Sequence, residues 1–139
     1  MSITAKGQLR KQPGHVIDIV PTCLAVAGAS YPTDVNGTTI TPLEGRSLVP
    51  AFTDQPITRE ALFWEHEGNA AVRVGDLKLV RSGKNAAWEL YDLAKDRTEQ
   101  HDLATERKAD VAALAARWDA WAVKANVVPY PVKGEKAKK

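Results

Sequence analysis

The chain has 139 residues, of which 44% are hydrophobic and 26% are charged. This balance is typical of a soluble globular protein, and the length fits one modest domain or part of a larger protein. The 19 basic and 17 acidic residues give a net charge of +2, which excludes a broad electrostatic surface for nucleic acid. A single cysteine, Cys23, excludes an intrachain disulfide and a cysteine-based zinc site.

The sequence pattern predicts neither a membrane-spanning segment nor a secretory signal peptide. No run of about 18 apolar residues predicts a transmembrane helix. The first residues, MSITAKGQLRKQPGHV, lack the apolar stretch of a secretory signal peptide.

The segment HVIDIVPTCLAVAG, residues 15–28, is the first apolar stretch of the chain. Its apolar residues recur near helical spacing, and Gly28 stands where a helix often ends. We predict a short helix at about 18–27, with Pro21 close to its start because proline is not tolerated in a helix interior. His15 and Asp18 are interpreted as polar residues that cap this helix.

Residues 29–58 contain four prolines and two glycines and are predicted to form a long ordered loop. Within it, RSLVPAF predicts one helical turn with Ser47 as its cap. A loop of this length is either functional or packs on a neighbouring part of the protein.

From Arg59 onward the pattern changes to the period of two that is typical of strands. Four short strands are predicted, joined by Gly, Asn and Asp turns: EALFWEHE (60–67), AAVRV (70–74), LKLVRS (77–82) and AAWELYDL (86–93). Each alternates apolar and polar side chains. The pattern predicts an antiparallel meander with one face against a core and one face in water.

The segment TERKADVAALAARWDAWAVKAN, 105–126, is the clearest element of the sequence. One apolar stripe recurs at helical spacing along it: Val111, Leu114, Ala115, Trp118, Trp121, Ala122 and Ala125. The stripe predicts a long helix, with Thr105 as N-cap, that covers the sheet. The fold class is therefore α+β, a four-stranded antiparallel sheet packed by a long C-terminal helix.

The end of the first strand, Trp64-Glu65-His66-Glu67, carries residue types found in acid–base and metal sites. Successive strand residues face opposite sides, so Glu65 and Glu67 cannot approach one ion together with His66. A polar strand end that leads into the turn Gly68-Asn69 is the plainer interpretation. Trp64 is the one tryptophan that neither the helix stripe nor the alternation assigns to the core.

Four segments, in this order, resemble the C-terminal part of the sulfatase family, in particular the bacterial arylsulfatase type. They are GHVIDIVPTCLAVAG, NGTTITPLEGRSLVPAF, REALFWEHEGNAAVRVGDLKLVRS and WELYDLAKDRTEQHDLA. The resemblance implies the C-terminal subdomain of an alkaline-phosphatase-like sulfatase fold. It divides the chain into the end of the sulfatase core (1–58), the C-terminal subdomain (59–128) and a basic, disordered tail (129–139).

In that family a formylglycine nucleophile and a calcium ion hydrolyse sulfate esters, and both belong to a larger N-terminal core. Formylglycine arises from a Cys/Ser-x-Pro-x-Arg motif, whereas Cys23 is followed by Leu24 and Ala25. We therefore expect no catalytic residue, metal ligand or cofactor in this chain. Its expected partner is the sulfatase core, and no nucleic acid or membrane is expected. Complete family members are often periplasmic or secreted.

Two functions follow from these observations. In the first, the chain is the C-terminal part of an arylsulfatase-like sulfuric ester hydrolase, inactive alone. The turn after the first strand then borders the substrate cleft of the complete enzyme, with Trp64, His66, Glu67 and Asn69 as candidates. In the second, the chain is an independent α+β module that binds a sulfated or carbohydrate ligand.

Overall fold

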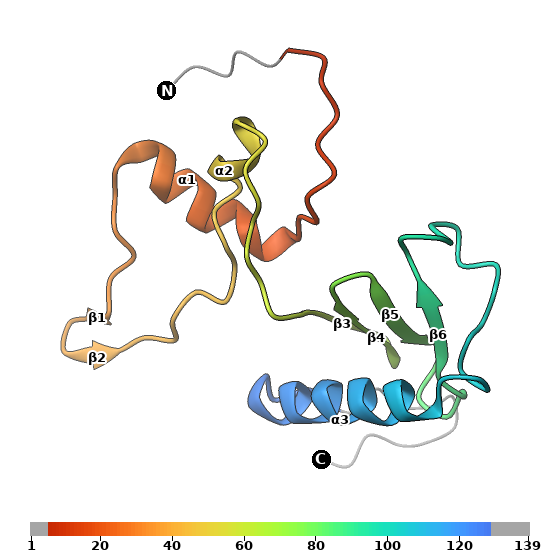
Figure 1. The fold of residues 1–139 in the computed structure, drawn as a ribbon. Coiled ribbons are helices and arrows are strands. Elements are labelled where there is room, and N and C mark those ends of the chain that lie inside the picture. Colours follow the sequence, from red (N-terminus) through yellow and green to blue (C-terminus); the bar gives the residue numbers. More distant parts are fainter. Residues whose placement is uncertain (1–5, 129–139) are drawn as a thin grey trace. The chain divides into compact units, whose positions relative to one another are not determined.

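The computed structural model of the chain describes residues 6–128. The chain divides into two compact units, Met1–Arg59 and Glu60–Lys139 (Figure 1). The predicted basic tail, 129–139, lies outside the described residues. No helix in the described part of the chain combines the length and the apolar composition that a membrane span requires.

The first unit begins with a helix that the sequence predicted. A short 3₁₀ turn, η1 (Val16–Asp18), runs directly into α1 (Ile19–Ala27). His15 caps the turn: its Nδ1 accepts from the amide of Ile17, and its own amide donates to Asp18 at 2.8 Å. Gly28 ends α1 with a φ of 67°, the left-handed conformation that glycine adopts without a steric cost. The predicted helix is confirmed.

The long loop contains two small elements. The strands β1 (Asp34–Val35) and β2 (Thr38–Thr39) form an exposed hairpin that the sequence analysis missed. Its turn is Asn36-Gly37, a pair that favours the positive φ angles of a tight hairpin. The predicted helical turn is α2 (Val49–Phe52). Ser47 is not its N-cap as predicted, because Leu48 holds that position without a side-chain capping bond; Ser47 Oγ accepts from the amide of Val49 at 3.2 Å.

A buried carboxylate holds the first unit together. Asp18 has no solvent exposure, and its oxygens accept from the amides of His15 and Arg46, each at 2.8 Å. The guanidinium of Arg59 donates to the same carboxylate at 2.7 Å. Burial alone would raise the pKa of Asp18, but the Arg46 amide, the Arg59 side chain and the His15 amide outweigh it and lower that pKa.

The chain around Asp18 leaves no room for a side chain at Gly45. A Cβ atom at that position would lie 2.0 Å from the carbonyl oxygen of Ile17. This close approach allows the neighbouring Arg46 amide to reach Asp18. A second link lies beside it: Thr22 Oγ1 donates to the Asp18 carbonyl and accepts from the amide of Leu48. The loop is therefore fastened to α1 at several points.

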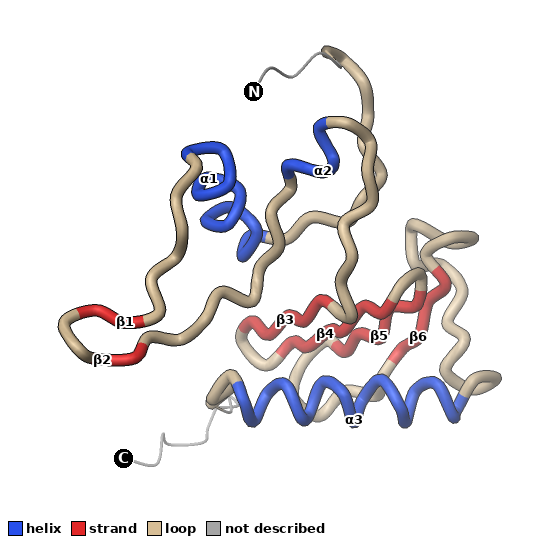
Figure 2. The backbone as a smooth tube through the Cα atoms, turned by 60° about the vertical axis from the view of Figure 1, so that its left-hand side comes forward, coloured by secondary structure: helices blue, strands red, loops and turns tan. Residues whose placement is uncertain are grey.

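The second unit is a four-stranded antiparallel meander and one helix (Figure 2). The strands are β3 (Leu62–His66), β4 (Asn69–Val74), β5 (Leu77–Arg81) and β6 (Glu89–Asp92), paired in this order. The helix α3 (Lys108–Lys124) contacts β4 and β5. The four predicted strands and the α+β fold class are confirmed.

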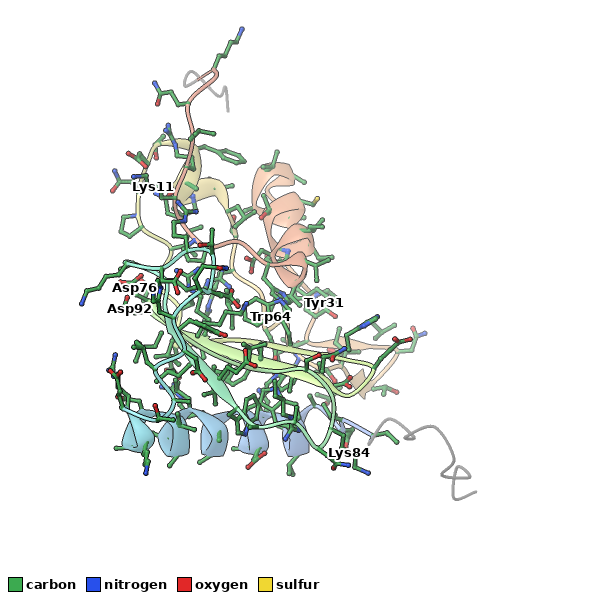
Figure 3. All side chains as sticks on the ribbon, turned by 90° about the vertical axis from the view of Figure 1, so that its right-hand side faces the viewer. Lys11, Tyr31, Trp64, Asp76, Lys84 and Asp92 are labelled. Atoms are coloured by element: carbon green, nitrogen blue, oxygen red, sulfur yellow. The ribbon has the colours of Figure 1, made fainter. Side chains whose placement is uncertain are left out.

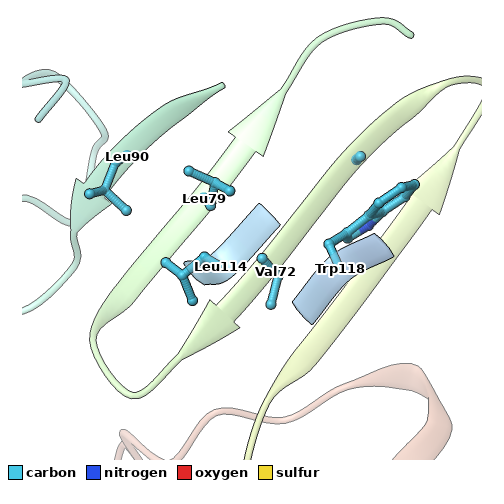
Figure 4. Packing of buried hydrophobic residues seen from close by; sticks show 6 residues of the cluster. Val72, Leu79, Leu90, Leu114 and Trp118 are labelled. Carbon is cyan, nitrogen blue, oxygen red and sulfur yellow. The ribbon is translucent and has the colours of Figure 1, made fainter. Parts of the chain in front are cut away.

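The core lies between α3 and one face of the sheet (Figure 4). Its buried residues come from alternate positions of three strands and from the predicted helix stripe: Ala70, Val72, Leu79, Leu90, Leu114 and Trp118. Ala125 does not extend the stripe, because it is the exposed C-cap of α3. Thr105 is not the N-cap, because the helix begins later, after Arg107, and the residues before it form turns.

The opposite face of the sheet is wet only in part, unlike the prediction. Leu62, Ala71 and Tyr91 on this face are at most 7% exposed. One reason is that the loop between β6 and α3 returns to this face, where Glu99 pairs with Lys78 beside Tyr91. The hydroxyl of Tyr91 donates to Glu89 at 2.7 Å, and this bond, together with burial, raises the pKa of Tyr91 to about 12.

Two aspartates order the loop between β6 and α3. Asp96 accepts from the amides of Gln100 and His101, and the His101 bond is the main reason that the pKa of Asp96 is lowered. Asp102 accepts from the amides of Leu90 and Ala104, which ties the end of the loop to β6. His101 is thus part of an ordered loop, and its side chain is exposed.

The Asp18 cluster generates the first prediction. In Asp18→Ala the Arg59 guanidinium loses its buried partner, so we expect the first unit to lose roughly 3–5 kcal/mol of stability. Because the pKa of Asp18 is lowered in the folded state, its stabilisation is complete above the unfolded pKa of about 3.9 and disappears as pH falls through the folded pKa. Urea unfolding followed through amide NMR signals of the first unit, at several pH values, measures both effects.

Asp34→Ala is the matched control, since Asp34 is an exposed aspartate of the same unit. We expect it to change stability by less than about 0.5 kcal/mol. Equal unfolding midpoints for the two variants would show that the buried ion pair does not hold the first unit together.

Candidate functional site

The predicted site residues lie at the tip of the β3–β4 hairpin. His66 and Asn69 are the last paired residues of the two strands, and Glu67 and Gly68 form the two-residue turn between them. Both turn residues have positive φ, 53° and 84°. This is the backbone that a tight two-residue hairpin requires, and Glu67 adopts it without the freedom of a glycine.

Polar side chains hold the hairpin tip in place. Glu65 Oε1 accepts from the amide of Gly68 at 2.9 Å. Asn69 Nδ2 donates to the carbonyl of His66 at 2.8 Å, while its Oδ1 accepts from the amide of Gly83 at 2.9 Å. Asn69 therefore links the β3–β4 tip to the loop between β5 and β6. Both ends of its side-chain amide are therefore engaged in positioning the turn.

The structure separates the remaining candidates by face. Phe63 stacks on Trp121 of α3 with ring centroids 5.1 Å apart, so the odd-numbered residues of β3 face the helix. Trp64 and His66 consequently lie on the opposite face. His66 and Glu67 are exposed, and Trp64 is half-buried. The carbonyl of Trp64 accepts from Trp118 Nε1 at 3.0 Å, which fixes the strand on the helix.

No metal centre forms at the tip. Glu65 faces the side opposite His66, as predicted, but Glu67 belongs to the turn and not to the strand as the prediction had it. Among residues 6–128, no three His, Cys, Asp or Glu side chains are grouped in a way that could hold a metal ion. Cys23 is exposed on α1.

The two ends of the sheet differ in character. The β4–β5 turn and the end of β6 meet at one end, marked by Asp76 and Asp92 in Figure 3. The hairpin tip and the β5–β6 loop, which carries Lys84, meet at the other end. We call this second end the tip end of the sheet. It gathers the exposed polar residues of two connections.

Arg81, which the sequence analysis did not single out, has a distinctive environment at the tip end. It ends β5 at the tip end and faces α3, next to Ala70 of the core. Its guanidinium carbon lies 4.6 Å from the ring centroid of Trp88 and 5.0 Å from that of Trp118. In the sequence Arg81 belongs to a regular strand, and only the three-dimensional proximity of the two tryptophans gives it this environment.

A match to a family model identifies the protein family of this chain. A model described as "N-sulphoglucosamine sulphohydrolase, C-terminal" matches residues 3–117. The chain belongs to the sulfatase family and represents its C-terminal portion. The family that was predicted from the order of four segments is thereby confirmed.

This sulfatase portion is similar to an uncharacterized sulfatase of Schizosaccharomyces pombe. The two are 29% identical over 123 residues, which cover 84% of this chain and 22% of that protein. The chain thus spans less than a quarter of the length of that relative.

Solved structures share the fold. One is a protein in complex with its substrate, D-glucosamine-2-N,6-O-disulfate, with 20% identity and a TM-score of 0.59 over 84% of this chain and 25% of that chain. Another is the phosphonate monoester hydrolase of Agrobacterium radiobacter, with 25% identity and a TM-score of 0.51 over 77% and 24% of the two chains. The sheet and helix therefore form the C-terminal subdomain of an alkaline-phosphatase-like fold.

The bridging role of Asn69 generates the second prediction. Asn69→Ala removes both of its side-chain hydrogen bonds, so we expect the tip and the β5–β6 loop to separate, at a cost of about 1 kcal/mol. Amide exchange at Gly83 should become several-fold faster while exchange in β5 stays unchanged. Asn85→Ala is the control, because Asn85 is exposed in the same loop and has no side-chain hydrogen bond within residues 6–128. Equal exchange at Gly83 in the two variants would contradict this role.

Proposed function

We propose that this chain forms the C-terminal part of a sulfuric ester hydrolase and hydrolyses no sulfate ester by itself. The observation that carries the proposal is the family match over residues 3–117. The relative from Schizosaccharomyces pombe is matched over 22% of its length, which supports a partner core that carries the chemistry.

The chemistry of the family requires groups that the residues of this chain do not fit. Cys23 lacks the Pro and Arg of a formylglycine motif, since Leu24, Ala25, Val26 and Ala27 follow it. Residues 6–128 contain no grouped ligands for calcium. In our proposal, the formylglycine nucleophile and the calcium site belong to the N-terminal core, and no step of the reaction passes through this chain's own side chains.

The helix α1 supports the proposed partner. None of its residues is buried, and apolar side chains are exposed around it, with Ile19 at 56%, Val20 at 50% and Val26 at 57%. A helix that is apolar all round is typical of the interior of a larger protein. We propose that α1 packs against the sulfatase core, which removes this apolar surface from water.

The substrate class that we propose is a sulfated amino sugar. Two observations support it, the description of the matching family and the glucosamine disulfate held by a protein of the same fold. The hairpin tip is our candidate for contact with the part of the substrate beyond the ester. Of its residues, His66 and Glu67 are exposed, Asn69 positions the turn, and Trp64 lies on the same face as His66.

The third prediction separates this proposal from an independent binding module. We expect the purified chain with calcium to release no more product from a chromogenic aryl sulfate than a heat-inactivated sample. When the chain replaces the matching segment of the Schizosaccharomyces pombe sulfatase, we expect the hybrid to keep sulfatase activity. Turnover by the isolated chain that persists in Cys23→Ala would place the chemistry within it. A hybrid that folds without activity, beside a chain that binds sulfated sugar, would favour the binding module.

The fourth prediction concerns His66 in the active hybrid. His66 has an exposed ring at the tip and can donate a hydrogen bond to a polar substituent of the sugar. His66→Ala should therefore raise KM several-fold for a sulfated amino sugar, with kcat less affected. The effect should be smaller for an aryl sulfate, which carries no polar group beyond the ester.

His101→Ala is the matched control, because His101 is also exposed but belongs to the β6–α3 loop. We expect its kinetic constants to equal those of the unaltered hybrid. If His66→Ala also leaves both constants unchanged on a panel of sulfated sugars, at unchanged stability, the tip is a surface turn and not a part of the substrate cleft.

A further inference from the structure

Arg81 occupies a cradle made by two tryptophans. Its guanidinium carbon lies within 5.0 Å of both ring centroids, those of Trp88 and Trp118, and the two rings meet at 64°. Trp88 directly precedes β6, and Trp118 belongs to α3 and is buried in the core between that helix and the sheet. The cation is therefore held between a loop and a helix that are both fixed to the sheet.

Within residues 6–128, the guanidinium of Arg81 has no hydrogen-bond acceptor and no carboxylate partner. The other two partly buried arginines of the second unit do have one: Arg73 pairs with Asp76, and Arg107 pairs with Asp110 at 2.8 Å. The nearest carboxylate along the same cross-strand row is Glu65, on the far side of Ala70, and Glu65 accepts from the amide of Gly68 instead.

Contacts with ring faces do not use the hydrogen-bonding capacity of an arginine. A cation–π contact is an electrostatic attraction between the cation and the ring face, and it supplies no acceptor oxygen to the five N–H groups of the guanidinium. The Nε atom of Arg81 is buried without a partner. An unpaired buried donor costs about 1–3 kcal/mol of stability. An arginine with such a donor therefore stabilises the core less than an apolar side chain of similar size would.

Packing alone does not account for the choice of residue. Methionine or leucine at the end of β5 would fill the space between Trp88 and Trp118 without an unpaired donor. A guanidinium carries a positive charge and a planar set of N–H donors. Contacts with the two tryptophan rings restrict this side chain, which lowers the entropy that it would lose on binding a ligand.

We propose that Arg81, oriented by Trp88 and Trp118, is an oxyanion-binding site that takes a sulfate group of a sulfated saccharide. The fork of N–H groups matches two oxygens of such a group. The site lies at the tip end of the sheet, the end that also carries His66, on the side that faces α3. The choice of a saccharide sulfate rests on the proposed function, whereas the affinity for an oxyanion rests on the geometry of Arg81 alone.

The test uses the full chain and follows the side-chain N–H signals of Arg81, Trp88 and Trp118 by NMR. Sodium sulfate is titrated at constant ionic strength, followed by a sulfated glucosamine disaccharide and its unsulfated counterpart. We expect saturable shifts of these three signals with sulfate and tighter binding of the sulfated disaccharide. The unsulfated sugar should cause no saturable shift.

Two substitutions identify the group that binds. Arg81→Met keeps the apolar packing and removes the charge, so we expect its Kd for sulfate to rise about tenfold or more. Arg81→Lys keeps the charge but loses the fork of N–H groups, so its Kd for sulfate should lie between those of the unaltered chain and Arg81→Met. Arg117→Met is the control, because Arg117 is an exposed arginine of α3 that should not affect binding.

Shifts that never saturate, or equal affinities of Arg81→Met and Arg117→Met, would overturn the site. If Arg81→Met does not fold, equal affinities of the unaltered chain and Arg81→Lys would overturn the role of the fork. A sulfated disaccharide that binds no better than free sulfate would overturn the proposal that the bound sulfate group belongs to a saccharide. These readouts need no turnover, so their failure is distinct from an inactive hybrid, which would count against the proposed function.

Discussion

The second unit depends on the insertion of one side chain, that of Trp118. Its ring is 6% exposed and fills the core between α3 and the sheet, and its Nε1 donates to the carbonyl of Trp64 in β3. The same ring meets Trp88 and the guanidinium of Arg81. Burying an aromatic ring of this size contributes on the order of 2–3 kcal/mol. More important here, its contacts with β3, with the end of β5 and with the residue before β6 fix these segments relative to one helix, so packing and site geometry have a common origin.

The parts of the fold that the sequence predicted are those set by local periodicity. Alternation of side chains determined the strands and their faces, and the spacing of Leu114, Trp118 and their neighbours determined the helix face. Both patterns are read within a few residues. The expected wet face failed for the same reason: Glu99 comes from a distant loop to cover the sheet beside Tyr91, and no period in either segment records that meeting.

The interactions that the sequence did not predict join residues far apart in the chain. Asp18 was interpreted as a capping residue, which it is, yet its carboxylate is buried because Arg46 and Arg59 reach it from 28 and 41 residues away. Asn69 was predicted as a candidate substrate contact, and the sequence did not reveal that its side chain also bridges to Gly83, 14 residues on. In each case the residue type was informative, and its partner was supplied only by the folded chain.

The shared fold also limits how far the framework of this subdomain could distinguish one substrate from another. A phosphonate monoester hydrolase and a protein that binds a sulfated glucosamine carry similar sheets and helices, so the framework itself does not select sulfate over phosphonate. In our proposal, substrate selection therefore comes from the connections of this framework, which can change without disturbing the core. In this chain the strand ends next to these connections carry the exposed His66, the bridging Asn69 and the cradled Arg81. Trp118 contacts β3 and Arg81 of β5 directly. In our proposal, these polar groups at one end of the sheet contact the substrate, while the groups that carry out hydrolysis belong to the N-terminal core.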